Sequence, residues 1–228
     1  MPDLPDWVET SADYMFEVGL RGTLRIAAYS LVASTVIGVV LGTLLTIRFL
    51  PSRALIRFYI EVWRGLPLIV TIFIIFFVFP VAGDRFEFDP FTSAAIGLSL
   101  WGSAQVAEAT RGAVQSIPRE QHEAASALGF GWVGRHVFVI LPQAFRRLLP
   151  PLVSLLVGII QNTTLAQIIG AAELLETGER SVERIASPPP AGIGEIHAIE
   201  IYGAVAVVFF IISFPLTRLA AYLERRLV

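Results

Sequence analysis

The chain has 228 residues, of which 55% are hydrophobic and 16% are charged, and its mean hydropathy is +0.69. Soluble domains are less apolar and more charged, so this composition excludes an ordinary soluble domain and also a disordered chain. The net charge of -2 argues against a nucleic-acid partner, and the absence of cysteine excludes disulfides and cysteine-ligated metals.

The first 18 residues are acidic and lack the basic start and apolar core of a signal peptide. We expect a short interfacial helix over residues 7–18. Five runs without Asp, Glu, Arg or His follow, at residues 26–47, 65–83, 90–107, 148–172 and 201–217. A helix crosses a bilayer with about 20 apolar residues, so each run is long enough, or nearly so, to span. The sequence therefore predicts an all-α membrane protein with five transmembrane helices in a single domain, 1–228.

The distribution of arginine predicts the orientation of these spans. With the N-terminus outside, the inner segments carry twelve of the seventeen arginines. Because cytoplasmic segments are enriched in positive charge, we expect the N-terminus outside and the C-terminus in the cytoplasm. The segment 173–200 then forms an acidic extracytoplasmic loop, and the segment 111–147 forms a long cytoplasmic loop.

The cytoplasmic loop contains a predicted short helix from Arg119 to Leu128. Pro118 is suited to the first turn, acidic residues follow near the helix N-terminus, and Gly129 is placed to cap the C-terminus. The apolar residues of this helix are mostly alanine, which suits a small helix seated in a cleft of a partner. A surface helix that merely orders the loop is an equally good interpretation of the pattern.

The same segment carries a family resemblance. Glu123-Ala124-Ala125-x-x-x-Gly129, followed by Val139-Ile140-Leu141-Pro142, resembles the EAA loop of ABC importer permease subunits, in which isoleucine usually stands at Val139. Gln143-Ala144 extends this to a pattern typical of the polar amino acid uptake branch. Further segments resemble the branch in chain order: Trp63-Arg64-Gly65-Leu66-Pro67-Leu68, Ala107-Glu108-Ala109-Thr110-Arg111-Gly112, Gln115-Ser116-Ile117-Pro118, Asn162-Thr163-Thr164-Leu165 and Pro215-Leu216-Thr217-Arg218.

The resemblance implies half of a transporter in the cell membrane, fed with an amino acid substrate by an extracytoplasmic binding protein. Two permease subunits, identical or sisters, would pair, and ABC ATPase subunits would dock beneath them and bind ATP and Mg²⁺. The chain lacks lysine, so it has no P-loop, and we expect no cofactor and no enzymatic activity of its own. The residues that the resemblance assigns to ATPase coupling are Glu120, Glu123, Ala124, Ala125, Leu128, Gly129, Leu141 and Pro142.

Polar residues near the spans are the candidates for the substrate pathway. The fourth span carries most of them, and the resemblance places substrate contacts along this helix. Many relatives have lysine where Gln161 stands. Packing against neighbouring helices explains such polar groups equally well, and Glu108 is better explained as an ion pair with Arg111. The candidates are Ser154, Gln161, Asn162, Thr163, Thr164 and Glu108.

Two other functions compete with the importer permease. An intramembrane serine protease needs a serine and a histidine at bilayer depth, and none of the three histidines lies in a long apolar run. An autonomous channel or secondary transporter tends to show internal repeats and intramembrane charge, and we find no clear repeat. We therefore expect no catalytic residue and no metal site.

Overall fold

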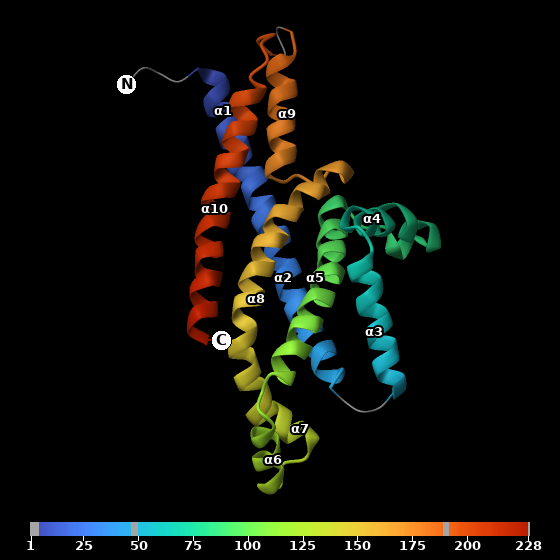
Figure 1. Cartoon of the computed structure of the whole chain (residues 1–228). Coiled ribbons are helices and arrows are strands. Elements are labelled where there is room, and N and C mark those ends of the chain that lie inside the picture. The colour runs from blue at the N-terminus through green and yellow to red at the C-terminus, as the bar shows by residue number, and fades with distance from the viewer. Residues whose placement is uncertain (1–4, 47–49, 189–191, 228) are drawn as a thin grey trace. The chain divides into compact units, whose positions relative to one another are not determined.

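The structure is a computed structural model that describes residues 5–46, 50–188 and 192–227. All regular structure within these ranges is helical, as the composition predicts (Figure 1). The elements, in which η denotes short 3-10 or π segments, are α1 (Asp6–Tyr14), η1 (Met15–Leu20), α2 (Arg21–Leu44), α3 (Leu50–Gly65), α4 (Leu68–Phe73), η2 (Ile74–Val78), η3 (Phe79–Ala82), η4 (Asp84–Phe86), α5 (Pro90–Gln115), α6 (Arg119–Ala127), α7 (Trp132–Arg135), η5 (His136–Ile140), α8 (Leu141–Asn162), η6 (Thr163–Ile169), α9 (Leu174–Ala186) and α10 (Ala198–Leu227).

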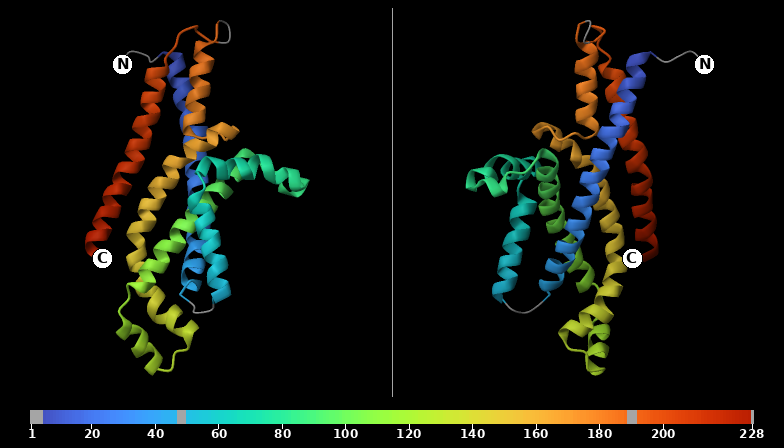
Figure 2. Two further views of the ribbon diagram at one scale, coloured as in Figure 1. Left: turned by 45° about the vertical axis from the view of Figure 1, so that its right-hand side comes forward. Right: turned by 180° about the vertical axis from the view of Figure 1, so that it is seen from behind.

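The helices form two compact units. The first contains the described residues of Met1–Ser30, Leu68–Leu98 and Gly158–Pro215. In this unit α1 and η1, α9 and the upper part of α10 lie side by side in each view (Figure 2), around a cluster of buried side chains. These are Met15, Leu174, Ile185, Ile201 and Val205. The start of α9 approaches the N-terminal helix closely, because a Cβ at Gly22 would lie 2.0 Å from the Ala172 carbonyl oxygen.

The second unit contains the described residues of Leu31–Pro67, Ser99–Val157 and Leu216–Val228. Here α2 and α5 pack with their backbones in close approach. A Cβ at Gly38 would lie 2.4 Å from Val106 Cβ, and one at Gly42 would lie 2.3 Å from the Ala107 carbonyl oxygen. A separate buried cluster joins the end of α5 to η5 and the start of α8. It fixes the start of α8, which carries the predicted coupling residues Leu141 and Pro142.

Three helical stretches among the described residues are long and apolar enough to cross a membrane: Asp6–Leu44, Trp132–Ile169 and Ala198–Leu227. A fourth is counted if Arg53–Gly65 and Leu68–Ala82, which are separated by Leu66 and Pro67, are taken together as one span. Helix α5 has 26 residues but is not among them. The five-span count and the orientation therefore stay predictions.

The predicted loops differ from the structure in their content. The expected interfacial helix over residues 7–18 does not form as a separate element, because α1, η1 and α2 run on as one helical stretch of 39 residues. The predicted cytoplasmic loop 111–147 is mostly helical. In both segments helical hydrogen bonding continues past charged residues, because Glu and Arg are themselves good helix formers and do not by themselves stop a helix.

Candidate functional site

Helix α6 begins at the predicted residue, Arg119. Pro118 is its N-cap, with φ -55° and ψ 144°, so the expectation of proline in the first turn is wrong by one position. The helical residues start at Arg119, and Glu120 lies in the first turn. A negative charge there interacts favourably with the helix dipole.

The C-terminal end of α6 is closed by the glycine that the sequence singles out. Gly129 has φ +84°, a left-handed conformation that favours glycine. The Gly129 N–H donates to the Ser126 carbonyl at 3.0 Å, and the Phe130 N–H donates to the Ala125 carbonyl at 3.1 Å. This pair of bonds is the Schellman arrangement, which satisfies carbonyls that would otherwise lack partners.

Side-chain bonds hold α6 against the following helices. Arg135 Nη1 donates to Ser126 Oγ at 2.7 Å, and Gln143 Nε2 donates to Gln121 Oε1 at 3.2 Å. Ala125 is the buried residue of the helix. One face of α6 is therefore fixed to α7 and α8, and the opposite face stays open.

The open face of α6 presents most of the predicted coupling residues. Glu120, Ala124 and Gly129 are exposed, and Leu128 is 78% exposed. Glu123 is also exposed and forms an ion pair with Arg119 at 2.8 Å. At the start of α8, Pro142 is exposed, whereas Leu141 packs against the buried cluster of Ile140 and its neighbours. Six of the eight predicted coupling residues are therefore exposed, whereas Ala125 is buried and Leu141 is partly buried.

Further apolar side chains are exposed around α7 and η5. Val133 is 66% exposed and Phe138 is 69% exposed. We call the exposed side chains of Leu128, Val133 and Phe138 together the apolar end surface. The sequence motif does not include Val133 or Phe138, and their exposure is visible only in the folded chain.

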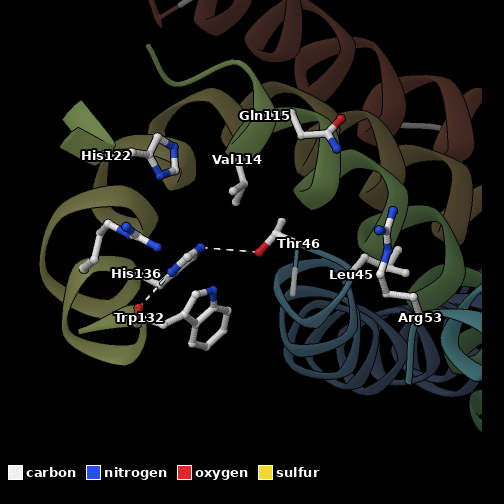
Figure 3. A pocket seen from close by; sticks show the side chains of 9 residues that line it. Leu45, Thr46, Arg53, Val114, Gln115, His122, Trp132 and His136 are labelled. Atoms are coloured by element: carbon white, nitrogen blue, oxygen red, sulfur yellow. Dashed lines mark hydrogen bonds between the residues drawn. The ribbon is translucent and has the colours of Figure 1, made fainter. Parts of the chain in front are cut away.

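A cavity of about 580 Å³ lies in the same unit (Figure 3). We call it the basic cavity, because Arg53, His122, Arg135 and His136 line it. His136 is buried and stacks on Trp132, with ring centroids 4.1 Å apart. Its Nδ1 donates to the Trp132 carbonyl at 2.9 Å, and its Nε2 lies 3.3 Å from Thr46 Oγ1.

The basic cavity is an electropositive site. Burial, and secondarily the charge of Arg135, lower the pKa of His122 below its usual value of 6.5. Sequence analysis uses the histidines only to weigh a protease, and it misses this cavity. No short-range signal reveals it, because its lining residues run from Leu45 to His136 and lie just after α2 and on α3, α5, α6, α7 and η5.

The predicted ion pair at the end of α5 is present. Arg111 Nε lies 3.1 Å from both carboxylate oxygens of Glu108, and Arg111 Nη1 donates to Gln115 Oε1 at 2.6 Å. Both charged side chains are partly exposed. The pairing favours an anchoring role over substrate contact for Glu108.

The polar residues after residue 160 bond mainly to their own helix. Asn162 Nδ2 donates to the Gly158 carbonyl, and the hydroxyls of Thr163 and Thr164 donate to the carbonyls of Ile160 and Gln161, all at 2.8 Å. Thr163 is fully buried, whereas Gln161 is exposed. Of this group, Gln161 alone keeps its side chain both exposed and without a bond inside the described structure.

Ser154 lies in the second unit, where it is exposed and lines a cavity of about 370 Å³ with Trp101, Gln105 and Leu155. The cavity has an apolar wall and a few polar groups, as small-molecule sites commonly do. The sequence predicts Ser154 because of its place on the fourth span. Trp101 and Gln105 are not predicted, because they lie on α5 and line the same cavity only in the folded chain.

A buried carboxylate begins α9. Glu173 is fully buried, and its side chain accepts hydrogen bonds from the Glu176 N–H at 2.8 Å and the Leu175 N–H at 3.1 Å. The Leu174 N–H donates a hydrogen bond to Thr23 Oγ1 at 3.1 Å. Burial raises the pKa of Glu173 to about 7, although the backbone bonds oppose this shift. The sequence reading treats Glu173 only as part of an acidic loop.

Comparison with protein families gives a match over most of the chain. The model of the binding-protein-dependent transport system inner membrane component matches residues 34–228. The glutamine transport system permease protein GlnP of Escherichia coli is 36% identical over 209 residues, covering 92% of this chain and 91% of that protein. The L-cystine transport system permease protein TcyB of Bacillus subtilis is 31% identical over 226 residues, covering 97% and 90%.

Solved structures share the fold. The crystal structure of an amino acid ABC transporter with histidines aligns with a TM-score of 0.79 at 24% identity, covering 98% of this chain and 100% of that chain. The MetNI methionine ABC transporter in an inward-facing conformation aligns with a TM-score of 0.73 at 18% identity, covering 92% and 94%. At these identities the likeness shows the fold alone.

Proposed function

The chain belongs to the family of binding-protein-dependent inner-membrane transport components, and from this premise we propose that it serves an ATP-driven importer of a polar amino acid. It is a multi-pass protein of the cell membrane. The names of its relatives, which specify glutamine and cystine, support an amino acid as the substrate. Between residues 141 and 172 the chain has no carboxylate to pair with a cationic side chain, which favours an amino acid whose side chain is uncharged.

The proposed coupling element is α6 with the apolar end surface. The observation that carries this proposal is a short helix fixed on one face and open on the other. Ala125 is 2% exposed on the fixed face, and Leu128 is 78% exposed on the open face. When a partner binds the open face and moves, α6 moves with it. Because the other face of α6 is bonded to α7 and α8, the motion is passed on to these helices.

The partner that we propose for this surface is the ABC ATPase. An exposed apolar group of Leu128, Val133 and Phe138 would be costly in water, and burying it in a groove of the ATPase removes that cost. Glu123 at the edge of the group supplies a charge for pairing with a basic residue of the partner. The ATPase would hold ATP and Mg²⁺, since this lysine-free chain has no P-loop.

The proposed substrate pathway needs a second permease subunit. Gln161 and Ser154 are exposed in this single chain and would otherwise face lipid, where unpaired polar groups are costly. Pairing through this face of α8 covers them and creates a polar path. The extracytoplasmic binding protein would deliver substrate on the side of residues 173–200.

Uptake by the purified system tests the proposed transport. The chain is co-reconstituted in vesicles with an ATPase and a binding protein encoded beside it, and uptake of labelled glutamine and cystine is measured with and without ATP. We expect uptake only with ATP and the loaded binding protein. Uptake by the chain alone would contradict the proposal and support a channel or secondary transporter.

Crosslinking tests the proposed coupling surface. Because the chain lacks cysteine, Leu128→Cys introduces a single reactive site on the open face. We expect it to crosslink to a cysteine in the ATPase groove. The control is Leu55→Cys on α3, which is 71% exposed and lies outside the proposed surface. Equal crosslinking of both variants, or none at Leu128→Cys, would refute the assignment.

A further inference from the structure

The basic cavity is rich in hydrogen-bond donors. Arg53 and Gln115 lie toward one side of the cavity, His122 and His136 lie toward the other, and the Thr46 hydroxyl lies between (Figure 3). Its volume of about 580 Å³ is within the range of sites that bind small molecules.

The described residues that line the cavity supply no negative charge to its cationic groups. None of the described residues that line it is acidic. Arg53 makes no hydrogen bond or ion pair with the described part of the chain. Arg135 donates from Nη1 to Ser126, but its Nε is buried and has no partner among the described residues. Two positive charges and a buried N–H donor therefore remain unmatched.

The arrangement of these groups selects the chemistry of the ligand. Arg53 comes from α3 and Arg135 from α7, so an anion that satisfies both must present acceptor oxygens in different directions. A phosphate group does so with several oxygens around a tetrahedral centre, whereas a planar carboxylate offers two oxygens in one plane. Arginine is also the side chain best suited to bind phosphate oxygens in pairs.

We propose that the basic cavity binds a phosphate group, supplied by inorganic phosphate or by the headgroup of an anionic phospholipid. The cavity lies at the ends of α2 and α5 and beside α6. In the predicted orientation these are the cytoplasmic ends of the spans, where both sources are present. A bound phosphate links the end of α2 and the start of α3 to the α6–α7 segment.

Equilibrium binding to the purified full chain tests this proposal. The ATPase is left out because it binds phosphates itself, and the chain is held in a maltoside detergent, which carries no phosphate. Radiolabelled inorganic phosphate is titrated, and short-chain phosphatidylglycerol is then added as a competitor. Displacement of phosphate by phosphatidylglycerol supports the lipid as a source, and saturable binding without displacement supports free phosphate.

Substitutions locate the binding. Arg53→Gln breaks no hydrogen bond of the described structure, and we expect it to weaken phosphate binding about tenfold or more. Arg135→Gln should do the same, whereas Arg135→Lys keeps the charge and should lose less. Arg57→Gln is the matched control, because Arg57 is an exposed arginine of α3 that does not line the cavity.

Two results would overturn the proposal. One is the absence of saturable binding of both phosphate and phosphatidylglycerol to the unmodified chain. The other is binding that Arg53→Gln and Arg135→Gln weaken no more than Arg57→Gln does. Circular dichroism of each variant shows whether its helices are intact, and Arg135→Lys keeps the test decisive if Arg135→Gln does not fold.

Discussion

Replacement of Gly129 by alanine tests whether the left-handed backbone conformation at the end of α6 is needed for function. Gly129 has φ +84°, and a Cβ built on it would meet nothing within 4 Å. Alanine therefore adds conformational strain without a steric clash. For a residue with a side chain the left-handed conformation costs about 1–2 kcal/mol, which corresponds to about a 5- to 30-fold change in an equilibrium constant. We expect the ratio of capped to frayed α6 ends to fall by this factor.

Leu128 lies at the capped end of α6, so a smaller population of the capped conformation should weaken binding of the ATPase. If the ATPase binds only the capped conformation, its apparent Kd for the permease rises by up to the same factor in Gly129→Ala. Asparagine visits the left-handed region more readily than alanine. Gly129→Asn should therefore lie between the unmodified chain and Gly129→Ala.

The control is a glycine-to-alanine substitution within a helix, where alanine should stabilise the helix rather than strain it. Gly112 lies in helix α5, and a Cβ there would also meet nothing within 4 Å. Gly112→Ala removes a helical glycine and should stabilise the helix by about 0.5–1 kcal/mol. ATPase binding to the immobilised permease and ATP hydrolysis stimulated by the loaded binding protein are measured for each variant. Unchanged binding and hydrolysis in Gly129→Ala would refute the reasoning.

Three further predictions concern other parts of the chain. Burial raises the pKa of Glu173 from 4.5 to about 7, so near neutral pH the folded protein keeps a proton that the unfolded chain releases. The free energy of unfolding should therefore fall by about 2–3 kcal/mol as the pH rises from about 5 to 8. Thermal unfolding of Glu173→Gln in detergent should lose most of this dependence, and an unchanged pH profile would contradict it. Gly42→Ala should destabilise the protein by about 1–3 kcal/mol, because its Cβ would lie 2.3 Å from the Ala107 carbonyl oxygen, and an unfolding midpoint equal to that of the unmodified chain would be evidence against this packing. Ser126→Cys should react with an impermeant reagent only from the cytoplasmic side of the membrane, and labelling from outside would reverse the predicted orientation.

The helix at α6 is predictable because its signals are local. Proline at the start, acidic residues in the first turn and glycine at the end act through neighbouring backbone groups, within about ten residues. The structure places the helix at Arg119–Ala127 and gives Gly129 the left-handed conformation. The family resemblance is confirmed for the same reason, since its motifs are short and occur in order along the chain.

The start of the chain is predicted less well. Five acidic residues before residue 18 suggest a boundary between a surface helix and a span. The structure instead continues one helical stretch from Asp6 to Leu44, whose first turns pack on α9 through Met15 and Leu174. That contact joins residues about 160 positions apart, and hydropathy within a window of about 20 residues cannot detect it.

The roles of single charged side chains in α9 and in the basic cavity could not be predicted from the sequence either. Glu173 looks like one more acid of an outer loop, yet it caps a helix from a fully buried position. Arg53 looks like one of twelve inner arginines, yet it faces a cavity that His122 and His136 also line. In both cases the pattern of charge along the chain predicts the side of the membrane, while the role of the individual charge depends on residues that only folding brings next to it. The charges that need explanation beyond orientation are therefore those that the fold leaves buried or without a partner.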